Sequence, residues 1–363
     1  MKNNFLVLLV ALTLFCCEGD KKDELEVTPF RDRPASYFDS LFISYGNGFT
    51  GGDGTYSVEL PDGRQLWIFG DTFLGEVASD FTRKKQSPLY IRNSFVVQDG
   101  DSIITLHQGE PWEFKSMMIP HEVLSGVRDE HQIWYWPGDA FVRDDTLHVF
   151  ASKFTQLDTG MWDFKFLETA LISYSLPGFQ EIAHQVIPKT KDLNIHFGHA
   201  VLQEDKTTYI YGYGQGGAYV AKTTNEVADD WQFFTGNGWT DNVEEAVPMT
   251  DADGSEQFSI IKTRDKYVYL TQEGELGTRV FTYTSNTPYG PWGNQRLVYN
   301  TPIPYDNENL FTYNSLIHPQ FANDSTILLS YNTNSFRLED HFENAGIYRP
   351  RFARIPFAEI FDD

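Results

Sequence analysis

Five acidic residues lie within two positions of a glycine, at places where the chain is expected to turn. Asp53 occurs in GGDG and Asp71 in FGDTF, while Asp139, Glu256 and Glu273 occur in WPGDAF, DGSE and TQEG. Two carboxyl groups cleave a glycosidic bond when one is protonated and the other is ionised. Carboxyl groups that share one partly dry cavity repel one another, and this separates their pKa values into an acid and a base. We therefore take these five residues as candidate catalytic residues.

Each acidic candidate also has a purely structural interpretation. Asp71 could be a turn aspartate that bonds its own backbone, and the GGDG loop around Asp53 could have no chemical role. Asp139 between a glycine and an alanine is open to the same interpretation. Glu256 ends DADGSE, whose acidic residues alternate as in a small calcium loop, so it could be a metal ligand or part of a solvated turn.

Two histidines three residues apart, His196 and His199, suggest a metal site. A regular strand places residues i and i+3 on opposite faces, so we expect no metal at this pair. We expect His199 instead to hold a carboxylate or a sugar hydroxyl. Asn314 occupies the corresponding place near the end of the chain, and we group it with the substrate-binding candidates.

Aromatic side chains near these acids could bind sugar. Trp134 and Trp136 precede Asp139, and Tyr213 lies in the glycine-rich GYGQGG. Aromatic rings offer the flat apolar surface on which the C–H face of a sugar stacks. Packing inside the fold is the alternative role for each ring.

Composition excludes some classes of partner. The chain has 363 residues with 28 basic and 51 acidic side chains, a formal charge of -23. A surface this negative repels phosphate backbones, so nucleic acid is not an expected partner. Aromatic residues make up 15% of the chain, which is more than a core alone requires and suits strands and sugar platforms.

The N-terminal segment has the features of an export signal. Lys2 precedes an apolar run at 5–15, which is shorter than the roughly 20 residues of a membrane-spanning helix. The stretch ending at Cys17 resembles a bacterial lipobox, with Cys17 as the lipidated residue. We therefore expect a lipoprotein signal peptide at 1–16 and a charged tether at 17–27. Secretion with cleavage elsewhere is the alternative.

Lipidation would place the protein at the outer membrane. The acidic tether resembles the surface-export signals of Bacteroidetes lipoproteins, so we expect a monomer that faces the cell surface or the periplasm. It would contact the membrane only through its lipid anchor.

One strand pattern recurs along residues 28–363. Alternating apolar runs that each follow a turn begin at Gln65, Thr146, Thr207, Lys266 and Thr326, at intervals of 81, 61, 59 and 60 residues. No convincing helical periodicity accompanies them. A repeat of about sixty residues accommodates the four strands of one propeller blade. The sequence therefore predicts an all-β, five-bladed propeller in a single domain; a β-sandwich is the alternative.

The last repeat contains only one strand after its first hairpin. We expect the segment near Ser40 to Tyr45 to supply the missing outermost strand and so close the ring. In a closed propeller the innermost strands converge on one axis, so their acidic residues would share one funnel.

The repeats and two motifs resemble a known superfamily. SNTPYGPW at 285–292 and the five repeats resemble the five-bladed propeller glycosidases typified by glycoside hydrolase family 43. The segment 51–75, which contains GGDG and FGDTF, is closer to Bacteroidetes propeller lipoproteins and the endo-D-arabinanase group. The resemblance implies hydrolysis of a glycosidic bond in a polysaccharide or oligosaccharide, with an arabinofuranosyl linkage as one option.

The same resemblance bears on cofactors. His318 is similar to the histidine that lies near an axial ion in family 43 enzymes, although here it precedes a proline. We therefore allow an axial calcium ion without requiring one. We expect no other cofactor.

Three functions are compatible with these features. A glycoside hydrolase needs a close pair of carboxyl groups, whereas a non-catalytic glycan-binding propeller would need only the aromatic residues. A lyase or sialidase is the third option, and the absence of the sialidase pattern SxDxGxTW counts against it.

Overall fold

The computed structural model describes residues 28–43, 48–84, 89–109, 113–158, 160, 162–191, 195–225 and 227–362. The expected signal peptide, the lipidated Cys17 and the tether lie outside these residues. Within them, no helix is both long enough and apolar enough to span a membrane.

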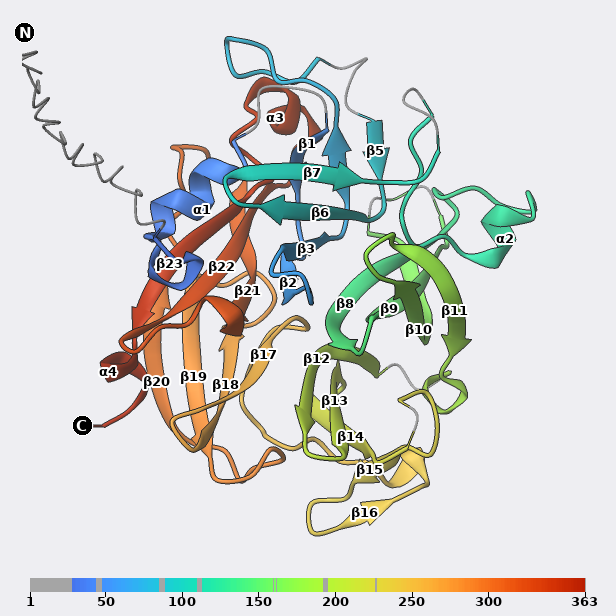
Figure 1. The fold of residues 1–363 in the computed structure, drawn as a ribbon, viewed down its shortest axis with the longest axis vertical. Helices are drawn as coiled ribbons and strands as arrows, with labels where there is room; N and C mark the ends of the chain where they lie inside the picture. Colours follow the sequence, from blue (N-terminus) through green and yellow to red (C-terminus); the bar gives the residue numbers. More distant parts are fainter. Residues whose placement is uncertain are drawn as a thin grey trace, which may run out of the picture.

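The described residues form five antiparallel blades around a common axis (Figure 1). Blade 1 contains β2 (Tyr56–Glu59), β3 (Gln65–Phe69), β6 (Ser94–Asp99) and β7 (Ser102–Leu106). Blade 2 contains β8 (Ile133–Arg143), β9 (Thr146–Gln156), β10 (Phe164–Ser175) and β11 (Gln180–Val186). Blade 3 contains β12 (His196–Glu204), β13 (Thr207–Gly214), β14 (Gly217–Thr223), β15 (Gln232–Phe234) and β16 (Trp239–Thr240). Blade 4 contains β17 (Ser259–Thr263), β18 (Lys266–Gln272), β19 (Arg279–Ser285) and β20 (Gly293–Asn300). Blade 5 contains β21 (Leu310–His318), β22 (Thr326–Ser335) and β23 (Pro350–Pro356).

The innermost strands close the ring. Strand β2 contacts β8, and the contacts continue from β8 to β12, from β12 to β17, from β17 to β21 and back to β2. Residues of all five innermost strands line a central cavity of about 410 Å³. This arrangement confirms the predicted all-β five-bladed propeller.

The five repeated runs are the second strands of the blades. Strands β3, β9, β13, β18 and β22 begin at Gln65, Thr146, Thr207, Lys266 and Thr326, the first residues of the repeated runs. Each pairs antiparallel with the innermost strand of its blade. The local pattern of turn followed by alternating apolar residues therefore located one strand in every blade.

The prediction of a strand near Ser40 to Tyr45 is wrong in the described part of that segment. Helix α1 (Ala35–Leu41) includes Ser40 and Leu41 and contacts β23, and no strand is assigned to the described residues 40–43. Asp39 Oδ1 accepts a hydrogen bond of 3.0 Å from the Phe352 backbone N–H. Blade 5 consequently has three strands among the described residues, with a helix beside its outer strand.

Aromatic packing explains why this segment is helical. Phe38 and Phe42 are four residues apart, so one face of a helix presents both rings. They are fully buried against Trp67 of blade 1 and Phe352 of blade 5. The helix thus joins the first and last blades through side chains rather than through strand pairing.

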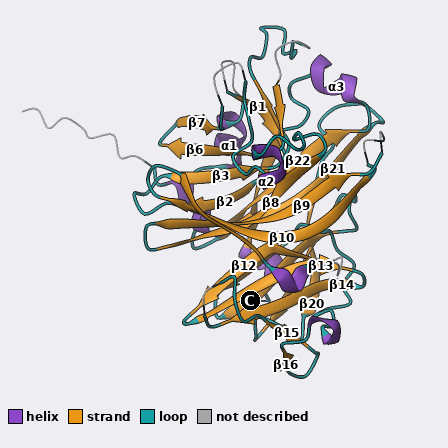
Figure 2. Ribbon diagram, turned by 90° about the vertical axis from the view of Figure 1, so that its right-hand side faces the viewer, coloured by secondary structure: helices purple, strands orange, loops and turns teal. Residues whose placement is uncertain are grey.

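A further sheet of three strands stands over one end of the ring. It consists of β1 (Phe49–Gly52), β4 (Thr72–Leu74) and β5 (Leu89–Ile91). The remaining elements are short: α2 (His121–Leu124) and α3 (Leu338–Glu343), both labelled in Figure 2, α4 (Phe357–Ile360), and 3-10 turns at Phe30–Asp32, Pro188–Thr190, Val243–Glu245 and Pro319–Phe321. The extra sheet carries the loops around Asp53 and Asp71, so it helps to build the site.

Candidate functional site

Three of the innermost strands carry a β-bulge at a corresponding position. The register shifts between Pro137 and Ala140 in β8, between Phe197 and Ala200 in β12, and between Tyr313 and Leu316 in β21. Bulges re-aim side chains and are common beside active sites. The shifted segments contain three of the predicted site residues: Asp139, His199 and Asn314.

Asp53 and Asp71 lie next to each other across the first hairpin of blade 1. The Gly70 N–H donates to the Asp53 backbone carbonyl at 2.8 Å, which sets the two aspartates side by side. Tyr313 Oη donates to Asp53 Oδ2 at 2.7 Å. Burial, followed by the negative charge of Asp71, raises the pKa of Asp53 to about 7. Asp53 is therefore a carboxyl group that can hold a proton near neutral pH.

Asp71 is buried and surrounded by hydrogen-bond donors. Trp136 Nε1 donates to its Oδ1 at 2.9 Å, Tyr90 Oη donates to Oδ2, and Arg92 lies 3.5 Å away. Burial raises the pKa of Asp71, while the charge of Arg92 and these hydrogen bonds oppose the rise. Donors on both oxygens favour the ionised form, so Asp71 supplies the charge that acts on Asp53.

Asp139 links blade 2 to blade 3. Its Oδ1 accepts from the Ala140 N–H and its Oδ2 from the Val201 N–H, each at 2.8 Å. Burial raises the pKa of Asp139 to about 7. Because both oxygens are engaged by backbone donors, this carboxyl group positions the two strands and faces the cavity that it lines.

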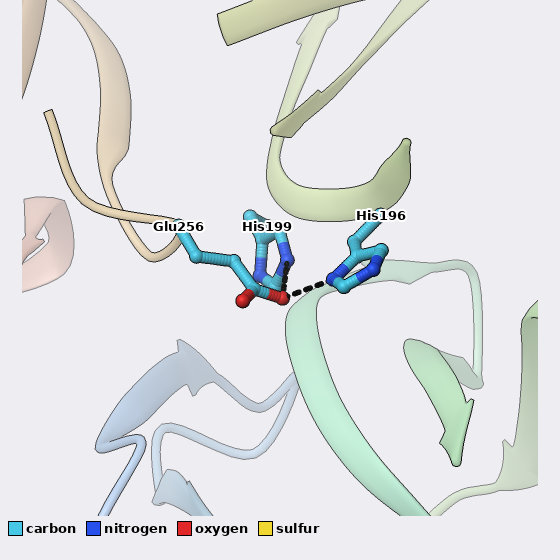
Figure 3. Close-up of side chains that lie close together, drawn as sticks. All are labelled: His196, His199 and Glu256. Atoms are coloured by element: carbon cyan, nitrogen blue, oxygen red, sulfur yellow. Dashed lines mark hydrogen bonds and ion pairs between the residues drawn. The ribbon is translucent and has the colours of Figure 1, made fainter. Parts of the chain in front are cut away.

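Glu256 is held between two histidines (Figure 3). His199 Nε2 lies 3.1 Å from Glu256 Oε1, and His196 Nδ1 contacts the same oxygen. Burial alone would raise the pKa of Glu256, but the two imidazoles outweigh it and hold the pKa well below its usual range. Glu256 is therefore ionised at the pH values at which Asp53 holds its proton.

The bulge in β12 corrects the expectation that His196 and His199 point to opposite faces. Phe197 pairs with Gly212 and Ala200 with Tyr211, so Gly198 and His199 have no partners in the ladder. Gly198 has a φ of +101°, a conformation that residues with a Cβ rarely adopt. This local break turns both imidazoles toward Glu256.

One buried tyrosine connects the carboxyl groups of different blades. The hydroxyl oxygen of Tyr56, at the start of β2, lies 3.3 Å from His199 Nδ1. Burial, followed by the charges of Asp139, Glu256 and Asp53, raises the pKa of Tyr56 well above its usual value. Acids from blades 1 and 2 and from the loop before blade 4 therefore act on a single phenol.

Glu273 does not join this cluster. It forms an exposed ion pair with Arg279 on the neighbouring strand, and that pairing lowers its pKa. After β18 the chain turns at Gly274, which has a φ of +55°. The turn brings Glu275 to Glu256, whose N–H donates to Glu275 Oε1 at 3.2 Å. Burial, followed by the negative charge of Glu256, raises the pKa of Glu275 to about 7.

The aromatic candidates divide into different roles. Trp134 is only 1% exposed and packs against Phe154 with the Arg92 guanidinium 4.0 Å from its ring, so it cannot stack on a sugar. Trp136 is half-buried and donates to Asp71. Tyr213 is half-buried and donates to the Gly254 carbonyl at 2.8 Å, which fixes the loop that carries Glu256. Asn314 is half-buried in its bulge, with a φ of +55°.

Sequence reasoning missed six residues of the site. They are the tyrosines and the arginine that contact the aspartates, the tyrosine that contacts His199, and the second glutamate beside Glu256: Tyr90, Arg92, Tyr313, Tyr348, Tyr56 and Glu275. A signal existed for two of them, because Tyr313 precedes the predicted Asn314 and Glu275 lies two residues after the predicted Glu273.

The surroundings of His318 do not fit a calcium ion. His318 is fully buried, and its Nδ1 lies 2.6 Å from Ser57 Oγ. Its Nε2 has no hydrogen-bond partner among the described residues. Burial and then the charge of Arg354 lower its pKa to about 3, and no carboxylate contributes to that shift. Calcium prefers six to eight oxygen ligands, and the surroundings of His318 do not supply them.

Comparison with known proteins identifies the fold. A family model described as a domain of unknown function (DUF5005) matches residues 35–357. No curated protein sequence matches the chain. The structure of a hydrolase candidate from Bacteroides ovatus is similar to this chain with a TM-score of 0.76 at 21% identity, covering 88% of this chain and 89% of the other.

Two glycoside hydrolase structures share the architecture at lower similarity. A mutant of the GH43 protein from Bacillus licheniformis has a TM-score of 0.51 at 13% identity over 86% of this chain and 53% of its own. The α-L-arabinofuranosidase from Podospora anserina, solved with cellotriose, has a TM-score of 0.50 at 12% identity over 86% of this chain and 93% of its own. These similarities support the propeller fold that the sequence predicted.

Proposed function

The chain belongs to the DUF5005 family, and we propose that it is a glycoside hydrolase acting on a polysaccharide or oligosaccharide. The observation that carries this proposal is that carboxyl groups of opposite protonation state act on one buried tyrosine, Tyr56, which lines the central cavity. Asp53 has a pKa of about 7, whereas Glu256 stays ionised. The charges of both carboxyl groups raise the pKa of Tyr56, so both groups lie close to this side chain.

These two states match the two tasks of glycosidic cleavage. The proton that Asp53 holds would pass to the leaving oxygen, and the ionised Glu256 would stabilise positive charge at the anomeric carbon or activate water. Asp71 would keep the proton on Asp53 through its negative charge. Asp139 would act as a positioning residue, because its two oxygens already accept backbone hydrogen bonds.

The substrate class is proposed from the resemblance and the similar structures. The structure from Podospora anserina is an α-L-arabinofuranosidase, so an arabinofuranosyl linkage is the first to test. We further propose that the enzyme is attached by a lipid at Cys17 to the outer membrane, where a polysaccharide substrate would be reached directly.

Hydrolysis is tested with the purified full chain and a panel of arabinans, arabinoxylans and xylans. We expect released sugars from at least one substrate, with a rate that falls as the pH rises through about 7, where Asp53 loses its proton. Asp53→Asn should lower the rate by about 10²- to 10⁴-fold. Asp62→Asn is the matched control, because Asp62 lies in an exposed turn and pairs with Arg64.

Two results would contradict the proposal. One is a rate for Asp53→Asn equal to that of the control. The other is glycan binding without any released sugar across the panel, which would favour a non-catalytic glycan-binding propeller.

A further inference from the structure

The residues around Glu256 have the composition of a transition-metal site. Its donor atoms are His196 Nδ1, His199 Nε2 and a Glu256 carboxylate oxygen, which lie within 4.8 Å of one another. A tetrahedral ion with bonds of about 2.0 to 2.2 Å places its ligand atoms about 3.3 to 3.6 Å apart. Small side-chain movements would therefore bring all three donors to bonding distance of one ion.

The backbone holds both imidazoles in place for this arrangement. The bulge at Gly198 and His199 has no function in the β12 ladder, since neither residue pairs with β13. The His196 ring stacks on Phe166 at a centroid distance of 4.0 Å and an interplanar angle of 28°. Two rings with restricted positions that converge on one point form a preorganised ligand pair.

The second ring nitrogen of His199 has an oxygen partner, as the second nitrogen of a metal-binding histidine commonly does. A ligating imidazole commonly donates its second N–H to an oxygen, which fixes the ring and its tautomer. His199 Nδ1 lies 3.3 Å from Tyr56 Oη, leaving Nε2 for a ligand. Tyr56 is buried, so this contact is protected from solvent.

We propose that His196, His199 and Glu256 bind one divalent transition-metal ion of the zinc class. Two imidazoles and one carboxylate favour such an ion over calcium or magnesium, which prefer oxygen ligands. Three protein ligands leave a fourth position for water or a sugar hydroxyl. The Glu256 side chain is 34% exposed and His199 lines the central cavity, so a small molecule can reach this position.

Metal binding can be measured without any substrate. The purified full chain is stripped with a chelator, titrated with Zn²⁺ by calorimetry, and analysed for bound metal after dialysis. We expect one ion per chain. His196→Gln and His199→Gln should each weaken binding by more than about 100-fold, which exceeds the 10- to 100-fold cost of losing an outer-shell partner.

The control uses a histidine that faces only one glutamate. His184 Nδ1 lies 3.5 Å from Glu181, so His184→Gln should leave zinc binding unchanged. Circular dichroism of each variant shows whether it is folded, and Glu256→Gln serves as the third ligand variant if either histidine variant unfolds. Zinc binding that is absent from the wild type, or that survives the ligand substitutions, would overturn the proposal.

Glu256 belongs both to the metal site and to the proposed hydrolysis, and two separate measurements, bound zinc and released sugar, distinguish the two proposals. A chain that binds zinc and releases no sugar keeps the metal site and loses the proposed function. A chain that releases sugar and binds no zinc keeps the function and loses the metal site.

Discussion

Asp53 precedes the first strand of blade 1 and Glu256 precedes the first strand of blade 4, and the surroundings of the two carboxyl groups differ. Asp53 lies beside a second carboxylate and accepts a hydrogen bond from a neutral tyrosine. Glu256 lies between two imidazoles. The pKa of Asp53 rises to about 7, while that of Glu256 falls. The same functional group can therefore serve as acid or as base according to its neighbours.

The two regions also differ in how the backbone positions them. A regular hairpin brings Asp71 to Asp53, with Gly70 donating to the Asp53 carbonyl. On the other side, an irregular bulge turns His196 and His199 toward Glu256. The histidine side therefore depends on a backbone conformation that glycine adopts readily and other residues rarely adopt, so substitutions should affect the two regions differently.

The largest expected effect on stability comes from Gly198→Ala. A Cβ at this position would clash with the Cβ of Phe150, and the φ of +101° disfavours any residue with a side chain. We expect the free energy of unfolding to fall by about 2 to 5 kcal/mol, combining the backbone cost with that of overpacking. Chemical denaturation measures this loss.

Gly63→Ala is the matched control for that substitution. Gly63 also has a positive φ, at +84°, but a Cβ there would meet no atom within 4 Å. It should lose only the backbone cost of about 1 to 2 kcal/mol. Equal losses in the two variants would show that the contact with Phe150 does not constrain the bulge.

The contrast between the hairpin and the bulge also explains what the sequence could predict. Strand starts such as Gln65 and Thr146 follow from turn residues and alternation, which are local features. The proximity of Asp53 and Asp71 follows from the length of one hairpin. The convergence of His196 and His199 depends on a register shift that no alternation pattern contains.

Two other differences have a tertiary cause. The segment around Phe38 is helical because its rings pack between the first and last blades, and such contacts override local preference. Glu275, and not the predicted Glu273, lies at the site because the chain turns at Gly274. Neither outcome could be deduced from composition or spacing.

A smaller effect is expected from Asp71→Asn, which removes the charge beside Asp53. Because the negative charge of Asp71 raises the pKa of Asp53, its loss should lower that pKa. Asp53 would then lose its proton at a lower pH, so the alkaline limb of the activity profile should move to lower pH. The profile of kcat/KM against pH measures this shift, with Asp62→Asn as the control. A limb that stays in place or moves to higher pH would contradict the role given to Asp71.

The smallest effect is expected from Tyr313→Phe. This substitution should shift the pKa of Asp53 in the opposite direction to Asp71→Asn, so it is the most specific test of the role of Asp53. The hydrogen bond of 2.7 Å from Tyr313 to Asp53 lowers the pKa of Asp53, because it stabilises the ionised form. Its removal should raise that pKa and move the alkaline limb to higher pH, opposite to Asp71→Asn. Tyr267→Phe is the matched control, because Tyr267 donates to Glu204 and does not contact Asp53. If Tyr313→Phe and Asp71→Asn moved the limb in the same direction, Asp53 could not be the group whose proton limits the reaction.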